Sequence, residues 1–292
     1  MAGTDCHYSN YCDSDSIVLY VEERMMQKIL IIFISVILLF LVLGCGHKIN
    51  KQELGPDEYF EYAKKKYDEG KYFDAITEFT VIVLKFSGHP VVDDAQYYLA
   101  ESHFKQKEYL LAISEYQKLI NEYPQSPYYV LAQFKIGMSY YKMSLRPELD
   151  QDLTKKALRQ FQTFIEEHPD HELRPSAEKY IKELREKLAV KKMLAATTYR
   201  KMGIYDAAVV YYDIVINDYY DTKEIVDAYY WKGICLNKMG KKQEAQNTLL
   251  ILMEKFPHNK YRSEVKKLLE EIDKDLQEQN TKQAEVNETL KN

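Results

Sequence analysis

The stretch YFEYAKKKYDEGKYFDAITEF, residues 59–79, is matched by a second stretch, QYYLAESHFKQKEYLLAISEY, residues 96–116. When the two are aligned, their small residues, their turns and their second apolar segments fall in register at a spacing of 37 residues. Each copy has the pattern of two helices joined by a short turn. One such copy cannot bury its apolar face alone, so the pattern predicts an all-α solenoid in which successive copies stack.

Five copies of this pattern occur between about residue 56 and residue 257. The first helix of each copy carries a small residue, at Ala63, Ala100, Gly137, Ala196 and Gly233. The second helix carries an alanine, at Ala75, Ala112, Ala157, Ala208 and Ala245. Four residues after each alanine comes a large residue: Phe79, Tyr116, Phe161, Tyr212 and Leu249. Twelve residues after each alanine is a position that holds proline in three copies: Ser87, Pro124, Pro169, Tyr220 and Pro257.

These recurring positions have a simple physical meaning. Small residues let two antiparallel helices approach closely, and the large residue one turn later fills the gap to the neighbouring unit. Gly70, Gly203 and Gly240 stand seven residues after the first small residue, where a turn between helices uses a left-handed glycine, and Lys107 takes that place in the second copy. The combination resembles the tetratricopeptide repeat (TPR). We expect a TPR α-solenoid of five helix-turn-helix repeats plus a C-terminal capping helix.

The copies are not uniform, and the departures divide the array in two. The third copy has eight additional residues between Gly137 and Ala157, which predict a longer loop. The segment that follows Pro169 has the pattern of one long helix from Ser176 into the fourth copy. We therefore expect TPR repeats 1–3 in residues 56–175 and repeats 4–5 with the capping helix in residues 176–277. Residues 278–292 are polar, and we expect a disordered tail. The capping helix carries apolar residues at helical spacing: Val265, Leu268, Leu269, Ile272 and Leu276.

An apolar block from Ile29 to Leu43 precedes the repeats. It is a membrane span, a buried helix or a signal that is removed. As a helix it would be about 22 Å long, which is short for a hydrocarbon core of about 30 Å. It has the size of the apolar region of a signal peptide, and Met25, Met26 and Lys28 provide a mildly positive start. The block therefore predicts export.

The block ends in Val42-Leu43-Gly44-Cys45, which resembles a bacterial lipobox. Gly44 gives a signal peptidase access to the cleavage site, and the Cys45 thiol forms the thioether to the lipid. The alternative is a short signal anchor with an incidental cysteine. We expect residues 25–44 to be a lipoprotein signal peptide, Cys45 to be the lipidated N-terminus, and residues 45–55 to be a tether linker. Residues 1–24 are acidic where a signal peptide is positive, so we interpret them as a mis-annotated leader.

Composition argues against several function classes. The net charge of −5 includes −3 in residues 1–44 (five acids, two bases), so the remainder carries −2, which gives no nucleic-acid signal. Cys235 is the single cysteine after Cys45, so no disulfide framework is expected. His168 and His171 have no acidic or cysteine partners at metal-binding spacing. With no catalytic motif and few residues after the capping helix, we expect neither an enzyme nor a cofactor other than the lipid.

The lipobox and five TPR units, with an insertion in the third unit and a long helix leading into the fourth, resemble the BamD family of outer-membrane lipoproteins. The most similar part is YIKELREKLAVKKMLAATTYRKMGIYDAAVVYYDIVINDYYDT, residues 180–222. The resemblance implies a lipid-anchored scaffold of the outer-membrane β-barrel assembly (Bam) complex, on the periplasmic face of the outer membrane of a Gram-negative bacterium. Its implied partners are the barrel-forming subunit with its periplasmic repeat domains and unfolded outer-membrane proteins.

Some features depart from that family. Ser87 and Tyr220 stand at proline positions, and the polar tail is long. Gly46 follows Cys45 where aspartate would retain a lipoprotein in the inner membrane, so sorting to the outer membrane is permitted.

The alternative function is another TPR envelope lipoprotein, such as a pilus-secretin pilot or a cell-envelope coordination factor. Repeats of more even spacing would favour that alternative.

Aromatic residues mark one face of the first helices. In the first three units an aromatic stands both three residues before and four residues after the small residue, which are seven positions apart and lie on one helix face. One hypothesis is an aromatic groove for an extended client segment. The alternative is that the rings pack against neighbouring repeats. The six residues are Phe60, Tyr67, Tyr97, Phe104, Phe134 and Tyr141.

By analogy with the family, the C-terminal half would contact the periplasmic domain of the barrel-forming subunit. We selected polar residues near the ends of helices in the most similar part, since such residues are exposed. An ordinary solvated face is the alternative. The candidates are Arg200, Lys201, Asp221, Lys223 and Glu224.

Overall fold

The computed structural model describes residues 25, 26, 28–35, 51 and 53–289, with side chains up to residue 282. The chain divides into two compact units, residues 1–54 and 55–292. In the first unit the described residues 28–35 are helical and their side chains are exposed. Gly44 and Cys45, on which the lipidation prediction depends, lie outside the described residues.

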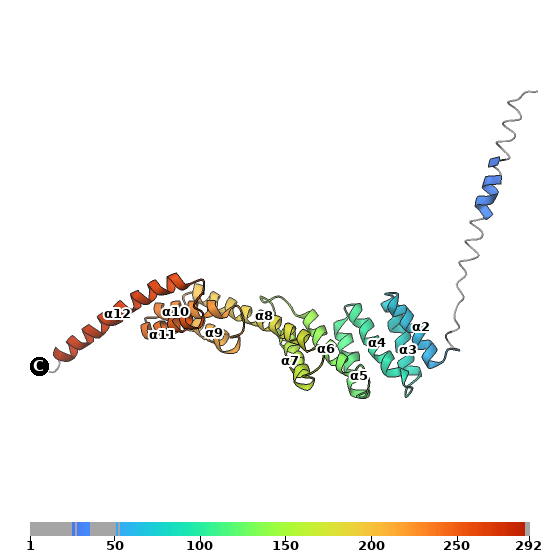
Figure 1. Cartoon of the computed structure of the whole chain (residues 1–292), viewed down its shortest axis with the longest axis horizontal. Coiled ribbons are helices and arrows are strands. Elements are labelled where there is room, and N and C mark those ends of the chain that lie inside the picture. The colour runs from blue at the N-terminus through green and yellow to red at the C-terminus, as the bar shows by residue number, and fades with distance from the viewer. Residues whose placement is uncertain (1–24, 27, 36–50, 52, 290–292) are drawn as a thin grey trace, which may run out of the picture. The chain divides into compact units, whose positions relative to one another are not determined.

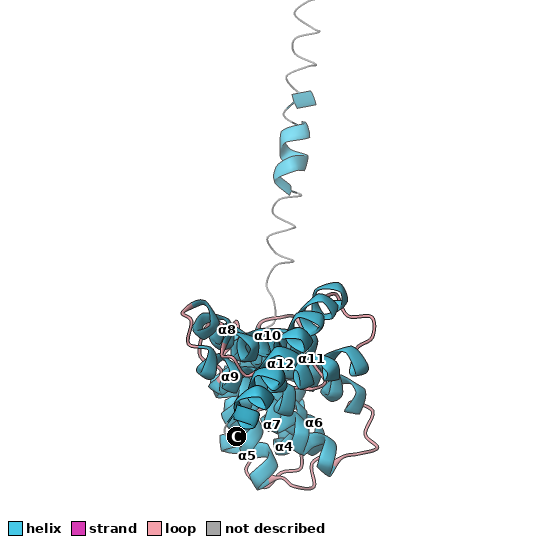
Figure 2. Ribbon diagram, turned by 90° about the vertical axis from the view of Figure 1, so that its left-hand side faces the viewer, coloured by secondary structure: helices cyan, strands magenta, loops and turns pink. Residues whose placement is uncertain are grey.

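The second unit is built from helices, and no strand occurs among the residues that the structure describes (Figure 2). Each helix packs against the next along the chain (Figure 1). The predicted solenoid of five helix-turn-helix repeats with a capping helix is confirmed. The helices are α2 (Pro56–Asp68), α3 (Tyr72–Lys85), α4 (Val91–Lys105), α5 (Tyr109–Glu122), α6 (Tyr129–Met143), α7 (Asp152–Glu167), α8 (Arg174–Lys201), α9 (Tyr205–Asp218), α10 (Ile225–Lys238), α11 (Lys242–Lys255) and α12 (Arg262–Thr289).

The small residues lie where the two helices of a unit touch. The Ala63, Ala100 and Ala196 side chains are fully buried. A Cβ atom added to Gly137 would lie 2.9 Å from the Phe161 ring, and one added to Gly233 would lie 2.5 Å from a Leu249 methyl group. The large residue therefore closes over the small residue of its own unit. Phe161 also stacks on the Tyr180 ring of α8, 5.2 Å between centroids, so it fills the gap to the next helix as predicted.

The turns between the paired helices use a left-handed backbone. Gly70, Gly203 and Gly240 have φ of 75°, 78° and 77°, respectively. Lys107, which takes the glycine position in the second repeat, adopts φ 65°. It is the one non-glycine residue with positive φ in the described part of the chain. The left-handed turn geometry is thus kept in the second repeat, although an L-residue sterically disfavours it.

The long helix α8 serves two units. It packs on α7 with its first part and on α9 with its second part, and Leu184 and Ala189 in its middle are buried. The insertion of the third unit forms the loop between α6 and α7 and is bound to α8. The Lys187 Nζ donates to Ser144 Oγ at 2.6 Å, and the Lys191 Nζ donates to the Glu148 carbonyl at 2.9 Å.

The capping helix α12 covers the last repeat. Val265 and Ile272 are fully buried, while Leu268, Leu269 and Leu276 are partly buried against the same core. The helix continues to Thr289, beyond residue 277 where we expected a disordered tail to begin. The segment from residue 278 is rich in Glu, Gln and Lys and lacks Gly and Pro, so its residues favour helix although they have no apolar face to bury.

Candidate functional site

One contact repeats along the solenoid and involves four of the eleven predicted groove and partner-surface residues, Tyr67, Phe104, Tyr141 and Arg200. The side chain four residues after the small residue of one repeat meets a side chain on the first helix of the next repeat, so the contacts run from α2 to α4, α4 to α6, α6 to α8 and α8 to α10. Tyr67 packs on Tyr98, 5.3 Å between ring centroids, and Tyr141 packs on Tyr180 at 4.7 Å. The Lys135 Nζ lies 5.1 Å from the centre of the Phe104 ring, and the Arg200 guanidinium lies 3.8 Å from the centre of the Trp231 ring. We call these four contacts the inter-repeat ladder.

The ladder accounts for three of the six predicted groove rings, namely Tyr67, Phe104 and Tyr141, which are all half-buried. Phe60 is also half-buried and packs on Phe79 and Tyr98, 5.8 Å between centroids in each case.

The remaining two rings are core residues. Tyr97 is 6% exposed and stacks on Tyr128 at 4.2 Å, while Phe134 is 7% exposed and packs on Phe161 and Phe164. The six rings therefore do not form one open aromatic face, because Tyr97 and Phe134 offer little surface to a client.

Two aromatic residues that the sequence pattern did not select connect these rings. Tyr98 contacts Phe60, Tyr67, Phe79, Tyr97 and Tyr128, and Tyr180 contacts Phe134, Tyr141 and Phe161. Tyr98, Lys135 and Trp231 each stand two residues before the small residue of their unit. A search for aromatic or basic residues at that offset would have found all three.

A buried carboxylate lies beside the ladder in the N-terminal half. Glu101 of α4 is 4% exposed and accepts hydrogen bonds from the Tyr116 hydroxyl and, at 3.4 Å, from the Tyr67 hydroxyl. The Lys135 Nζ of α6 lies 2.6 Å from the same carboxylate. Burial, together with the nearby Glu101 charge, raises the pKa of Tyr116 and of Tyr67, so both hydroxyls remain donors. Residues from α2, α4, α5 and α6 are thereby joined around one charge.

The C-terminal half carries a different cluster at its end of the ladder. The Arg200 guanidinium covers the Trp231 ring, and its Nε donates to the Tyr212 hydroxyl at 3.3 Å. Tyr230, next to Trp231, stacks on Tyr261 with ring planes 3° apart and centroids 3.8 Å apart. Arg200, Tyr230, Trp231 and Tyr261 are all half-exposed, and we call these four residues the Arg200–Trp231 cluster.

The other predicted partner residues lie elsewhere on α8 and on the α9–α10 loop. The Arg185 guanidinium of α8 pairs with both carboxylate oxygens of Asp221, at 2.6 to 3.0 Å. Donation by Arg185 lowers the pKa of the Asp221 carboxyl, and burial raises that of Glu224. Lys223 lies 3.6 Å from Glu186 of α8.

The structure therefore separates the predicted partner residues into two groups. Asp221, Lys223 and Glu224 share the α9–α10 loop, beside Arg185 and Glu186 of α8. Arg200 and Lys201 lie about 22 Å further along that helix, at a rise of about 1.5 Å per residue.

A pocket of about 440 Å³ lies between the α6–α7 loop, the middle of α8 and the end of α9. It contains both acidic and basic side chains, so it has no single charge sign to select a ligand. None of the predicted site residues lines it. Its lining residues are Glu148, Leu149, Asp150, Gln151, Lys155, Leu188, Lys191, Lys192 and Tyr219.

Comparison with known protein families shows which family this chain belongs to. Residues 52–250, more than half of the chain, match the family model YfiO, described as outer membrane lipoprotein. The chain belongs to the YfiO family. The match spans the repeats from α2 to most of α11, and so includes the ladder and three of the four residues of the Arg200–Trp231 cluster, Arg200, Tyr230 and Trp231. No described helix of this YfiO-family chain is both long enough and apolar enough to cross a membrane. No curated protein sequence is similar enough to count as a match.

Solved structures similar to this YfiO-family chain are TPR proteins. The TPR2AB domain of yeast Sti1, solved with pHSP90, is 18% identical over 77% of this chain and 86% of that chain, with a TM-score of 0.40. A TPR repeat protein of Bacteroides fragilis is 12% identical over 75% and 98%, with a TM-score of 0.41. A thermophilic TPR protein of Thermus thermophilus is 16% identical over 74% and 99%, with a TM-score of 0.33.

Proposed function

We propose that this chain is a BamD-type scaffold of the outer-membrane β-barrel assembly complex, non-catalytic and anchored on the periplasmic face by a lipid on Cys45. Membership of the YfiO family of outer membrane lipoproteins is the observation that carries the proposal. The repeat solenoid supports it, since stacked helix pairs present extended surfaces to protein partners. In this proposal the C-terminal half binds the barrel-forming subunit and the N-terminal half receives unfolded outer-membrane proteins.

The Arg200–Trp231 cluster is the proposed contact with the barrel-forming subunit. Trp, Tyr and Arg are the residue types that dominate binding energy at protein interfaces. Here all three lie together, half-exposed and already held in place by stacking and by the Tyr212 hydroxyl. Little side-chain freedom would be lost on binding, which favours affinity.

The matched experiment uses two arginines of α8. Arg200→Ala with Trp231→Ala removes the cluster, whereas Arg185→Ala removes an arginine that also lies near aromatic rings, those of Tyr219 and Tyr220. Binding of each variant to the purified periplasmic region of the barrel-forming subunit is measured by calorimetry. We expect the double variant to lose about 30-fold or more in affinity, as expected for a hot spot, and Arg185→Ala to bind as the unmodified protein does.

The reverse result would overturn the assignment of this surface. If Arg185→Ala weakens binding and the double variant does not, the interface is formed instead by Asp221, Lys223 and Glu224.

The half-exposed rings Phe60, Tyr67, Phe104 and Tyr141 are the proposed contacts for client segments in the N-terminal half. Because Tyr97 and Phe134 are buried, their removal would test folding more than binding. Phe104→Ala is the sharper variant, since this ring is half-exposed. We expect weaker binding of an aromatic-rich peptide from an outer-membrane protein with unchanged helicity by circular dichroism. Undiminished affinity in a variant that keeps its helicity would refute the client site.

A pull-down distinguishes the proposed function from its alternative. Gentle detergent extraction followed by capture through a C-terminal tag is expected to recover a large barrel protein with repeated periplasmic domains. Recovery of a secretin would favour a pilus-secretin pilot, the alternative TPR envelope lipoprotein. Mass spectrometry of the mature N-terminus tests the anchor separately, because a lipid on Cys45 adds its mass to that residue.

A further inference from the structure

The second helix of each repeat presents an outer stripe on the side opposite its packed alanine. The stripe consists of the residues two before and two, five and nine after that alanine, which lie within about 60° of one another around a helix. In the first unit the stripe is Phe73, Thr77, Thr80 and Leu84, and in the second it is Leu110, Ser114, Gln117 and Asn121. The later stripes are Lys155, Arg159, Gln162 and Glu166; Asp206, Val210, Asp213 and Asn217; and Gln243, Asn247, Leu250 and Glu254.

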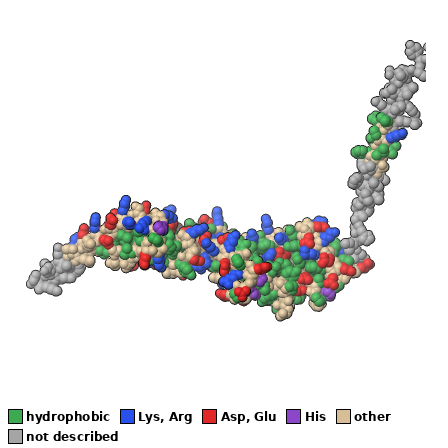
Figure 3. Space-filling view, in the orientation of Figure 1, with side chains coloured by type: hydrophobic (Ala, Val, Ile, Leu, Met, Phe, Trp, Pro, Cys, Tyr) green, Lys and Arg blue, Asp and Glu red, His purple; other side chains and the backbone are tan. Residues whose placement is uncertain are grey.

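The stripes differ in polarity, and the first is the least polar. The third, fourth and fifth contain charged residues, the second has one apolar residue among three polar ones, and the first has apolar residues and threonines alone. The space-filling view shows hydrophobic side chains gathered over the region of α2 to α5 (Figure 3). The outer face of α3 therefore differs from the equivalent faces of the other units.

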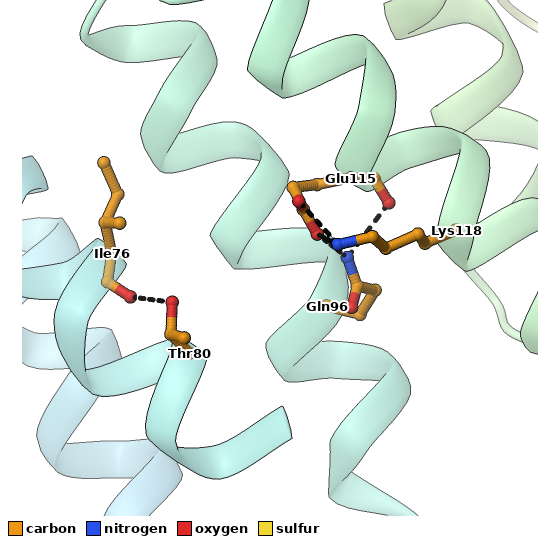
Figure 4. Close-up of polar contacts among 5 residues, drawn as sticks. All are labelled: Ile76, Thr80, Gln96, Glu115 and Lys118. Atoms are coloured by element: carbon orange, nitrogen blue, oxygen red, sulfur yellow. Dashed lines mark hydrogen bonds and ion pairs between the residues drawn. The ribbon is translucent and has the colours of Figure 1, made fainter. Parts of the chain in front are cut away.

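Three of the four residues of the α3 face are exposed, and its hydroxyl groups are hydrogen-bonded within the helix. Phe73 is 73% exposed and Leu84 is 77% exposed. The Thr80 hydroxyl donates to the Ile76 carbonyl at 2.7 Å (Figure 4), and the Thr77 hydroxyl donates to the Phe73 carbonyl at 3.2 Å. The hydroxyl groups of both threonines thus already have acceptors within the helix and need none from a contacting phase. The exposed charged residues of α3, Asp74 and Lys85, lie near its two ends.

The position of α3 in the chain indicates what covers this face. Ten residues, 46–55, separate Cys45 from the first residue of α2. At an extended length of about 3.3–3.6 Å per residue, this linker reaches about 35 Å at most. A lipid on Cys45 therefore keeps the first repeat permanently close to a bilayer, at a high effective concentration.

We infer that the outer face of α3, formed by Phe73, Thr77, Thr80 and Leu84, lies on the membrane surface and inserts its apolar side chains among the lipid headgroups. The inference rests on the proposed anchor at Cys45. Apolar side chains on one face of a helix that lies in the interface plane are the usual means of such contact. The face would act as a second attachment point beside the lipid and would fix how the first repeat is turned toward the membrane.

The test measures lipid contact at matched positions. The lipidated full chain is labelled through Thr77→Cys with an environment-sensitive fluorophore, and a second sample carries Arg159→Cys, the equivalent position of the third repeat. The remaining native cysteine of the proposed mature chain, Cys235, is buried, and burial raises the pKa of its thiol to about 11, so it does not compete for label. Both samples are reconstituted in vesicles of phosphatidylethanolamine and phosphatidylglycerol that carry nitroxide-labelled lipid.

We expect lipid quenching at residue 77 to be about threefold or more stronger than at residue 159, with a blue-shifted emission at residue 77 alone. Adding Phe73→Glu and Leu84→Glu is expected to remove the difference, and since both side chains are exposed the fold is kept. Equal, weak quenching at the two positions would overturn the inference. A blue shift without lipid quenching would also overturn it, because it would show that protein covers the face.

The two failures are distinguishable. A mature chain without the mass of a lipid on its N-terminal Cys45 contradicts the lipid anchor and hence the proposed function. Loss of the quenching contrast in protein whose lipidation is verified by mass contradicts the α3 contact alone.

Discussion

The two halves of the solenoid use the same ladder positions for different purposes. In repeats 1–3 the position four residues after the small residue holds Tyr67, Phe104 and Tyr141, and two of these rings lie next to the Glu101 carboxylate or its partner Lys135. In repeat 4 the same position holds Arg200, which covers Trp231. In the N-terminal half, ladder residues therefore lie around the buried Glu101 carboxylate. The C-terminal half leaves the arginine and its ring half-exposed.

This difference shows how one repeat pattern can serve both folding and recognition. A buried charge is costly to leave unpaired, so the residues around Glu101 constrain one another and stabilise the N-terminal half. Within the described part of the chain no buried charge like that of Glu101 contacts the Arg200–Trp231 cluster, whose side chains are half-exposed. Four main substitutions, three of them with a matched control substitution, test this contrast from the largest expected effect to the smallest.

Removal of the buried carboxylate should have the largest effect. Glu101→Ala leaves the Lys135 ammonium and the fully buried Tyr116 hydroxyl without their shared acceptor. We expect the free energy of unfolding to fall by about 2–3 kcal/mol, at the low end for a broken buried pair because Lys135 is near enough to the surface to reach water. Chemical denaturation provides the measurement.

Glu115→Ala, in the same repeat, is the control for Glu101→Ala. Its partner Gln96 keeps a second acceptor, the Glu115 backbone carbonyl at 3.0 Å. We expect a loss of about 1 kcal/mol or less. Equal losses for the two variants would show that the Glu101 centre has no special role in the N-terminal half.

The close contact between α10 and α11 at Gly233, in the C-terminal half, should show the next-largest effect. A Cβ on Gly233 would lie 2.5 Å and 2.7 Å from Leu249 Cδ2 and Cγ. Such overpacking costs up to about 3 kcal/mol, while alanine gains about 1 kcal/mol in helix propensity, so Gly233→Ala should destabilise by about 2 kcal/mol. The melting temperature and denaturation midpoint are the readouts.

Gly137→Ala is the matched substitution in the N-terminal half. There the added Cβ meets the Phe161 ring at 2.9 Å, a milder conflict. We expect the overpacking and the helix-propensity gain to cancel within about 1 kcal/mol. A larger loss for Gly137→Ala than for Gly233→Ala would reverse the predicted order.

The ion pair between α8 and the α9–α10 loop should show a smaller, pH-dependent effect. Arg185→Ala is expected to cost about 0.5–1 kcal/mol at neutral pH, since the Asp221 side chain is 40% exposed and the pair is screened. The folded-state pKa of Asp221 lies below its usual value of 3.8. The stabilisation is therefore present above about pH 4 and is lost as the pH falls through the folded-state pKa.

Stability curves of the unmodified and Arg185→Ala proteins should therefore approach one another below about pH 4. A difference between them that stays constant from pH 7 to pH 2 would mean that Arg185 acts by packing on Tyr219 and Tyr220 and not by its charge.

The smallest effect is a gain. Lys107 holds a left-handed backbone conformation where the other turns have glycine, and L-residues pay about 1 kcal/mol for it. Lys107→Gly should raise the free energy of unfolding by about 0.5 kcal/mol after the greater freedom of glycine in the unfolded chain is included. Gly203→Ala, the converse change in the C-terminal half, should lower it. If both Lys107→Gly and Gly203→Ala raised the free energy of unfolding, the assigned left-handed turn geometry would be contradicted.

The features predictable from the sequence are those set by contacts within one repeat. The alanine and large-residue spacings located the helix pairs, and Gly70, Gly203, Gly240 and Lys107 located the turns. The long helix α8 and the apolar positions of the capping helix also follow from local periodicity. Each depends on residues that are close in the chain.

The features that could not be predicted depend on which helix faces another. Periodicity placed Tyr97 and Phe134 on one face with Tyr67, but it did not reveal that Tyr128, Phe161 and Phe164 bury them. The Glu101 centre joins residues from α2 to α6, and no local pattern specifies that they converge. The continuation of α12 past residue 277 was missed because a polar composition was taken to mean disorder, although its residues favour helix.

The length of α8 also sets the angle by which repeats 4 and 5 are rotated about the helix axis relative to repeats 1–3. Its 28 residues turn by about 100° each, so the direction in which its last residues point is fixed by how many residues come before them. Deleting one residue between Leu184 and Met193 would rotate repeats 4 and 5 by about 100° relative to repeats 1–3, with every side chain of both halves unchanged. The joint between the halves is therefore expected to tolerate substitution far more readily than insertion or deletion.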